Sequence, residues 1–171
     1  LVVLLSLPLG VLIFYLLGGF KLALVFAILW TDRMVISYTR ILPEFGIELV
    51  SLPIIMSGIL LGPFKGFAFA FIITPLLDSM QLFYKIPAFE EGWLPFIPSL
   101  YDFFKGVTAM IAGLLFAAGF LPFWILLICI VIKNAMYFVG DRLFGFPPRM
   151  AYILNIPFNI VLFGFFSQFF F

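Results

Sequence analysis

Residues 2–41 read VVLLSLPLGVLIFYLLGGFKLALVFAILWTDRMVISYTRI, two apolar runs that are separated by Gly18-Gly19-Phe20-Lys21. A transmembrane helix needs roughly 20 apolar residues to cross a hydrocarbon core of about 30 Å, and each run approaches that length. Similar breaks, in which glycine, proline and charged residues collect, recur along the rest of the chain. They predict helices near residues 2–19, 22–41, 48–62, 65–84, 99–119, 122–140 and 150–170.

The composition leads to the same class of fold. Of 171 residues, 65% are hydrophobic and only 10% are charged, against roughly 25% charged in ordinary soluble domains. So few charges do not cover the surface of a soluble fold, whereas a surface that faces a lipid bilayer needs none. We therefore expect a single transmembrane domain over residues 1–171, an all-α polytopic helix bundle. Its core is six helices in residues 21–171, and residues 1–20 add one more, because they lack the features of a signal peptide.

Charge and residue usage exclude several function classes. The net charge is +1, so no basic field is present to attract nucleic acid, and no nucleic-acid partner is expected. The chain has no histidine, which excludes the usual zinc sites, Ser–His triads and haem ligation by histidine. Its single cysteine, Cys129, cannot form an intrachain disulfide. We expect no metal and no cofactor.

Lysine in short loops predicts the orientation of the bundle. Lys21 and Lys65 lie in alternate hairpins and therefore on one face, which we interpret as cytoplasmic. The segments around Glu48, residues 85–99 and Asp141 then lie outside. Arg142 and Arg149 are on that outer face and count against the assignment.

Charged residues inside the expected spans are costly unless they face a bundle interior or a cavity. Asp32 and Arg33 lie near the middle of the second expected helix. We give equal weight to two interpretations of Asp32 and Arg33, a structural ion pair and a functional role. Asp102 and Lys105 are three residues apart and share a helix face, which favours a local structural pair.

Polar side chains form one stripe on each of the last two expected helices. The stripes consist of Asn134, Tyr137 and Asp141 at i, i+3 and i+7, and of Tyr152, Asn155 and Asn159. Because both stripes lie near the expected outer end, they predict a pocket for a small ligand. The alternative is that the amides merely form hydrogen bonds between helices. Glu48 and residues 85–99 are the alternative location for the pocket.

A different kind of surface is predicted on the second expected helix. Ala23 and Ala27 form an A-x-x-x-A pair, and small residues four apart allow another helix to approach closely. On a helical wheel they lie nearly opposite Asp32. We expect this face to dock a partner helix.

Three of these features resemble a known family, the substrate-binding S components of energy-coupling-factor vitamin transporters. Residues 45–66, FGIELVSLPIIMSGILLGPFKG, resemble that family's second helix and its Leu-Gly-Pro hairpin. The pair Ala23 and Ala27 resembles the alanine motif that docks on a transmembrane coupling subunit. Residues 156–160, IPFNI, resemble a Pro-Phe-Asn element in the last helix. The resemblance covers residues 21–171, and residues 1–20 depart from it by adding a helix.

The resemblance implies a multi-pass protein of a prokaryotic plasma membrane that captures a water-soluble vitamin or its precursor at the outer face. Such a protein is not an enzyme, and no G-x-x-x-x-G-K-[ST] loop is present for ATP. Energy would come from a separate ATPase pair through the coupling subunit. The implied ligand bears a ring, and Trp93 and Tyr101 would offer ring faces to it.

Two other classes remain as alternatives. Asp102 and Asp141 faintly resemble the paired aspartates of intramembrane aspartyl proteases, in which two carboxyls share a proton. The size and hydrophobicity also resemble those of the small rod-shape-determining membrane proteins, which act as scaffolds and bind no ligand.

Overall fold

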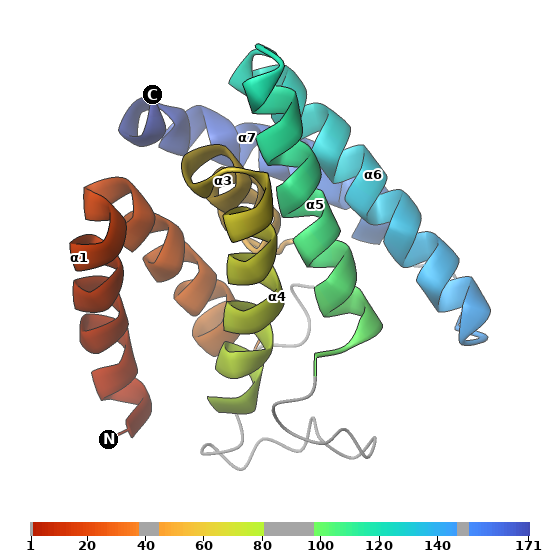
Figure 1. The fold of residues 1–171 in the computed structure, drawn as a ribbon. Helices are drawn as coiled ribbons and strands as arrows, with labels where there is room; N and C mark the ends of the chain where they lie inside the picture. The colour runs from red at the N-terminus through yellow and green to blue at the C-terminus, as the bar shows by residue number, and fades with distance from the viewer. Residues whose placement is uncertain (1, 38–44, 81–97, 147–150) are drawn as a thin grey trace.

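The computed structural model describes residues 2–37, 45–80, 98–146 and 151–171, and the regular structure within these ranges is entirely helical (Figure 1). Its elements are α1 (Val2–Thr31), the π-helical turn η1 (Asp32–Ile36), α3 (Ser51–Leu61), α4 (Pro63–Met80), α5 (Leu100–Ala117), α6 (Pro122–Leu143) and α7 (Ala151–Phe170). The predicted ligand residue Trp93 lies outside the described ranges.

Helix α1 consists of two arms that meet at Gly18 and Gly19 and lie side by side (Figure 1). Gly19 has a φ of 71° and a ψ of −166°, a conformation that is essentially restricted to glycine. The rings of Phe14 and Phe26 stack across the two arms at 4.8 Å between centroids. The additional N-terminal helix expected at residues 2–19 is therefore packed on the second arm.

Four helices in the described part of the chain are long and apolar enough to cross a membrane. By length and composition they are Leu5–Ile36, Leu100–Ala117, Pro122–Leu143 and Ala151–Phe170, and the first of these contains the bend at Gly18 and Gly19.

A helix was expected near residues 48–62, and the structure has α3 at Ser51–Leu61. Its 11 residues extend roughly 16 Å at 1.5 Å per residue, about half of a hydrocarbon core. Nine of them, Ser51 to Ile59, are buried. Helix α3 contacts α1, α4, α5, α6 and α7, so it is a short core helix around which the longer helices pack.

Glycines bring three helices into backbone contact at one end of the bundle. A Cβ atom on Gly58 of α3 would lie 1.9 Å from the carbonyl oxygen of Ala109 in α5. A Cβ atom on Gly66 of α4 would lie 2.5 Å from the Cα of Gly58, and one on Gly113 of α5 would lie 2.6 Å from the backbone nitrogen of Pro63. We call Gly58, Gly66 and Gly113 the glycine junction.

The two ends of the bundle differ. The bend of α1, the turns between α3 and α4 and between α5 and α6, and the C-terminus share the upper end in Figure 1, whereas η1, the start of α5 and the end of α6 lie toward the opposite end. At the upper end, the ammonium group of Lys21 donates a hydrogen bond to the carbonyl oxygen of Phe170 at 2.5 Å.

The expected docking face on the second arm of α1 is not open in this structure. Ala23 is only 5% exposed and Ala27 is half-buried. Because α1 contacts both α3 and α4, and its first arm covers Phe26 on the second, the second arm is enclosed by the chain itself. A partner helix cannot reach Ala23 without displacing these contacts.

Candidate ligand-binding pocket

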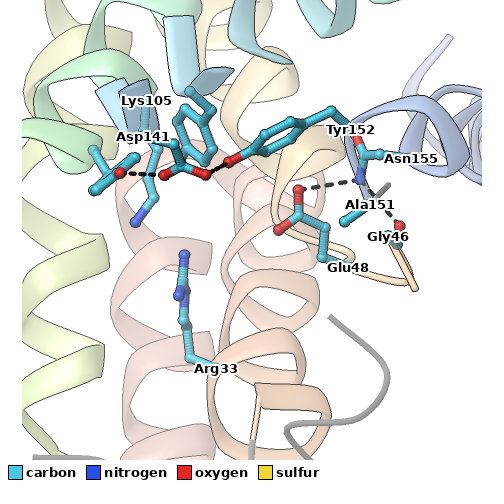
Figure 2. Close-up of a pocket in the computed structure, with 10 residues that line it drawn as sticks. Arg33, Gly46, Glu48, Lys105, Asp141, Ala151, Tyr152 and Asn155 are labelled. Atoms are coloured by element: carbon cyan, nitrogen blue, oxygen red, sulfur yellow. Dashed lines mark hydrogen bonds between the residues drawn. The ribbon is translucent and has the colours of Figure 1, made fainter. Parts of the chain in front are cut away.

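A cavity of about 320 Å³ lies at the end of the bundle opposite the glycine junction. Its walls come from η1, from the segment before α3, and from α5, α6 and α7 (Figure 2). The lining residues are Arg33, Gly46, Glu48, Tyr101, Lys105, Tyr137, Asp141, Ala151, Tyr152 and Asn155. Most of them carry a charge, a phenol or an amide, which is unusual inside a chain of this composition.

Asp141, in the last turn of α6, is held between two phenols. The hydroxyl of Tyr101 on α5 donates to Asp141 Oδ1 at 2.5 Å, and the hydroxyl of Tyr152 on α7 donates to Asp141 Oδ2. The carboxylate is buried, so each of these charge-assisted bonds replaces a bond to water. One side chain therefore ties three helices together at the wall of the cavity.

Glu48 is positioned by a buried lysine and an amide. The ammonium group of Lys133 on α6 donates to Glu48 Oε1 and to Ser51 Oγ at 2.5 Å. Asn155 Nδ2 on α7 donates to Glu48 Oε1 at 3.1 Å. Burial alone would raise the pKa of the Glu48 carboxyl, but the charge of Lys133 and its hydrogen bond hold that pKa below its ordinary value.

The segment before α3 can approach α7 closely because it contains Gly46. Gly46 has a φ of 73°, and a Cβ atom there would lie 2.5 Å from the carbonyl oxygen of Ala151. Its own carbonyl accepts a second bond from Asn155 Nδ2 at 3.1 Å. Only glycine fits both the conformation and the space, so Gly46 lets this segment approach α7.

Two cations face the cavity from η1 and α5. Arg33 Nη1 lies 3.3 Å from Asp78 Oδ1, and Arg33 Nε lies 3.6 Å from Asp32 Oδ2. The Lys105 ammonium donates to Asp102 Oδ1 at 2.6 Å. Figure 2 shows the guanidinium of Arg33 and the ammonium of Lys105 directed toward the same space beneath Asp141.

Five of the predicted site residues line the cavity, and two others, Asn134 and Asn159, do not. Glu48, Tyr101, Tyr137, Asp141 and Asn155 line the cavity. Asn134 and Asn159 do not; their amides donate to the carbonyl oxygens of Tyr152 at 2.8 Å and of Asn155 at 2.9 Å. The amide of Asn134 therefore forms a hydrogen bond between α6 and α7, which was the alternative to a role in the pocket. The amide of Asn159 forms a hydrogen bond within α7.

Sequence reasoning did not assign four lining residues to the site, Arg33, Gly46, Lys105 and Ala151. Arg33 was weighed equally between a structural and a functional role, and Lys105 was assigned to a structural pair. Tyr152, which belongs to one of the two polar stripes that predict a pocket, does line the cavity. Arg33 and Lys105 do form ion pairs, and their charged ends also reach the cavity. The sequence signal for Arg33 and Lys105 was a charged residue within an apolar helix. Such a residue indicates either a cavity or an ion-pair partner, and the sequence does not show which.

Asp102 and Asp141 have different hydrogen-bond partners. Its carboxylate caps the start of α5 by accepting from the backbone and hydroxyl of Ser99 at 2.9 Å and 2.7 Å, in addition to Lys105. Asp102 is not among the lining residues. Within the described ranges, no three potential metal ligands are grouped closely enough to hold a metal ion.

Two polar atoms in the cavity wall have no hydrogen-bond partner among the described residues, the hydroxyl oxygen of Tyr137 and Oδ1 of Asn155. Buried polar groups normally have a partner because an unsatisfied one costs free energy. Both atoms are therefore candidates to contact a ligand.

Comparison with protein-family models, with curated proteins and with solved structures found no match to this chain. Its functional interpretation therefore rests on the residues described above.

Proposed function

We propose that this chain is the membrane-embedded, high-affinity substrate-binding subunit of a micronutrient uptake transporter in a prokaryotic plasma membrane. Its substrate would be a small water-soluble vitamin or precursor. Energy would come from a separate ATPase pair, transmitted through a transmembrane coupling subunit.

The observation that carries the proposal is the polar cavity at one end of an apolar helical bundle. Small-molecule sites are typically concave, with volumes of about 300–1,000 Å³ and a few convergent polar groups. This cavity has about 320 Å³, which suits a small metabolite rather than a lipid or a dinucleotide. Ionisable groups within a membrane protein are costly and are usually functional, and here cations and carboxylates meet in one cavity.

The placement of the residues favours a binding protein over the two alternatives. A scaffold has no need for a cavity whose walls contain a phenol and an amide oxygen without partners among the described residues. An aspartyl protease needs two carboxyls that share a proton, whereas Asp102 is engaged by Ser99 and Lys105 and only Asp141 lines the cavity. A coupling subunit would have to contact a surface other than Ala23, which is buried.

The test is a thermal-shift screen of the detergent-purified chain against water-soluble vitamins and their precursors. A ligand that binds only the native state stabilises it by RT ln(1 + [L]/Kd), about 2.7 kcal/mol at one hundred times Kd. One compound that raises the melting temperature at low micromolar concentration supports the proposal. A folded, monodisperse protein that no compound stabilises contradicts it and favours the scaffold.

A further inference from the structure

We infer that the ligand of this cavity is a small carboxylate that carries an N–H donor at its other end. The inference rests on the proposed function, since it names the chemistry of the substrate in the same cavity. It follows from the separation of donors and acceptors on the cavity wall.

The donor side consists of Arg33 and Lys105. Each cation has an ion-pair partner, Asp78 for Arg33 at 3.3 Å and Asp102 for Lys105 at 2.6 Å. Neither of these aspartates lines the cavity, so they position the two cations from outside the cavity wall. The two positive ends face one space together with the carboxylate of Asp141, which accepts hydrogen bonds from Tyr101 and Tyr152. An anionic group of a ligand in this space can contact both cations.

A carboxylate suits this side better than a neutral oxygen does. A guanidinium and an ammonium offer several N–H donors and no acceptor, and charge-assisted bonds to a carboxylate are about twice as strong as neutral ones. Tyr137 lines the same cavity, and its hydroxyl has no hydrogen-bond partner among the described residues. This hydroxyl can donate a further hydrogen bond to a ligand in the cavity.

The acceptor side consists of Glu48 and Asn155, which lie across the view from Lys105 in Figure 2. The orientation of the Asn155 amide is determined by its neighbours, because Nδ2 meets two acceptors, Gly46 O and Glu48 Oε1, both at 3.1 Å. A flipped amide would place oxygen against oxygen. Asn155 Oδ1 is thus an acceptor, it has no partner in the described structure, and the residue is 2% exposed. An N–H group of the ligand satisfies it.

Aromatic rings limit the shape of the ligand between these two sides. The ring of Tyr137 lies edge-on to that of Tyr101 at 5.1 Å and to that of Tyr152 at 6.5 Å. Three phenols line this cavity of about 320 Å³, which has room for one small molecule.

The experiment uses matched pairs of probes that differ only in charge at one end. They are biotin with biotinamide, pantothenate with panthenol, and para-aminobenzoate with para-aminobenzamide, and thiamine and riboflavin serve as ring compounds without a carboxylate. Each probe is tested by thermal shift and by isothermal titration with the detergent-purified chain. We expect at least one carboxylate to bind, and its neutral partner to bind about ten- to a hundredfold more weakly, because a hydrogen bond to a charged group is lost.

Variants of Arg33 and Lys105 test whether these two residues bind the carboxylate of the ligand. Arg33→Gln and Lys105→Gln should each weaken binding of the carboxylate about tenfold or more, whereas Arg33→Lys and Lys105→Arg keep the charge and should restore part of it. Lys65→Gln, which removes an exposed lysine at the start of α4, is the matched control and should leave the affinity unchanged. If Lys105→Gln does not fold, the double variant Lys105→Gln/Asp102→Asn removes both charges and is tested in its place.

The outcomes distinguish this inference from the proposed function. Tight binding of thiamine or riboflavin, with an affinity that Arg33→Gln and Lys105→Gln leave unchanged, overturns the carboxylate assignment and leaves the proposed function intact. Equal binding of a carboxylate and its neutral partner also overturns it. A folded protein that binds none of the probes counts against both proposals.

Discussion

The glycine junction and the cavity lie at opposite ends of the same bundle, and they are built from opposite kinds of contact. At the junction, helices touch through backbone atoms, and a Cβ on Gly58 would lie 1.9 Å from a carbonyl oxygen. At the cavity, the helices stay apart, and long polar side chains such as Lys133 and Tyr152 connect them. Small residues therefore close one end of the bundle, and side-chain length keeps the other end open.

This difference predicts different responses to mutation. The junction should tolerate no added atom, because the nearest atoms belong to helix backbones that cannot rotate away. The cavity should be sensitive to the removal of a charge or a hydroxyl, because each polar group there supports another. The predictions below test this contrast, from the largest expected effect to the smallest.

The largest effect is expected for Lys133→Met at the cavity. Lys133 is fully buried, and its removal leaves Glu48 without its cation and Ser51 without its donor. Loss of one partner of a buried pair costs about 3–5 kcal/mol of unfolding free energy, measured by denaturation in detergent. The double variant Lys133→Met/Glu48→Gln should recover part of this loss. A double variant that is as unstable as the single one would show that the pair is not the cause.

Gly58→Ala should break the junction. The added methyl group meets the carbonyl of Ala109, and over-packing of this kind costs about 2–3 kcal/mol. Thermal unfolding and size-exclusion chromatography measure the effect. Gly164→Ala on α7 is the matched control, because its Cβ would have nothing within 4 Å. Equal stability of the two variants would mean that α3 and α5 do not meet as described.

Tyr152→Phe removes one of the two hydroxyls on Asp141. The ring stays, but a buried carboxylate loses a donor, so the unfolding free energy should fall by about 1.5–2 kcal/mol. The affinity for a ligand should fall as well, since Tyr152 lines the cavity. Tyr15→Phe, at an exposed tyrosine of α1, should change neither quantity. A stable Tyr152→Phe variant would show that Tyr101 alone is sufficient to hold Asp141.

The smallest effect is expected between the two arms of α1. Ser6→Ala removes the acceptor of the Trp30 indole N–H, now at 2.9 Å, and should cost about 1 kcal/mol. Thermal unfolding reports it, as does tryptophan fluorescence in a variant in which Trp93 and Trp124 are replaced by phenylalanine. Ser167→Ala near the end of α7, whose hydroxyl contacts only a carbonyl of its own helix at 3.4 Å in the described structure, should be neutral. An unchanged fluorescence spectrum for Ser6→Ala would contradict the packing of the two arms.

Part of the site was predictable because helical periodicity places residues on one face without any knowledge of the neighbours. Tyr137 and Asp141 are four residues apart, and both line the cavity. The same rule identifies a smooth face at Ala23 and Ala27 but not what covers that face, and in this structure Ala23 is buried by the chain itself. For residues 48–62, an apolar run predicts burial in lipid or in protein equally well, and the structure shows that most of α3 is buried among the other helices.

The sequence by itself determined that this chain is apolar and helical, and which residues carry the scarce charges. Those properties depend on composition and on local backbone preference, which act within a few residues. Only the tertiary structure decided that Arg33, Glu48, Lys105 and Asp141 share one cavity and that Gly58 and Gly113 share one contact. Such neighbours come from different elements of the chain. Whether they meet depends on the spacing between helices, which long side chains increase and glycines decrease.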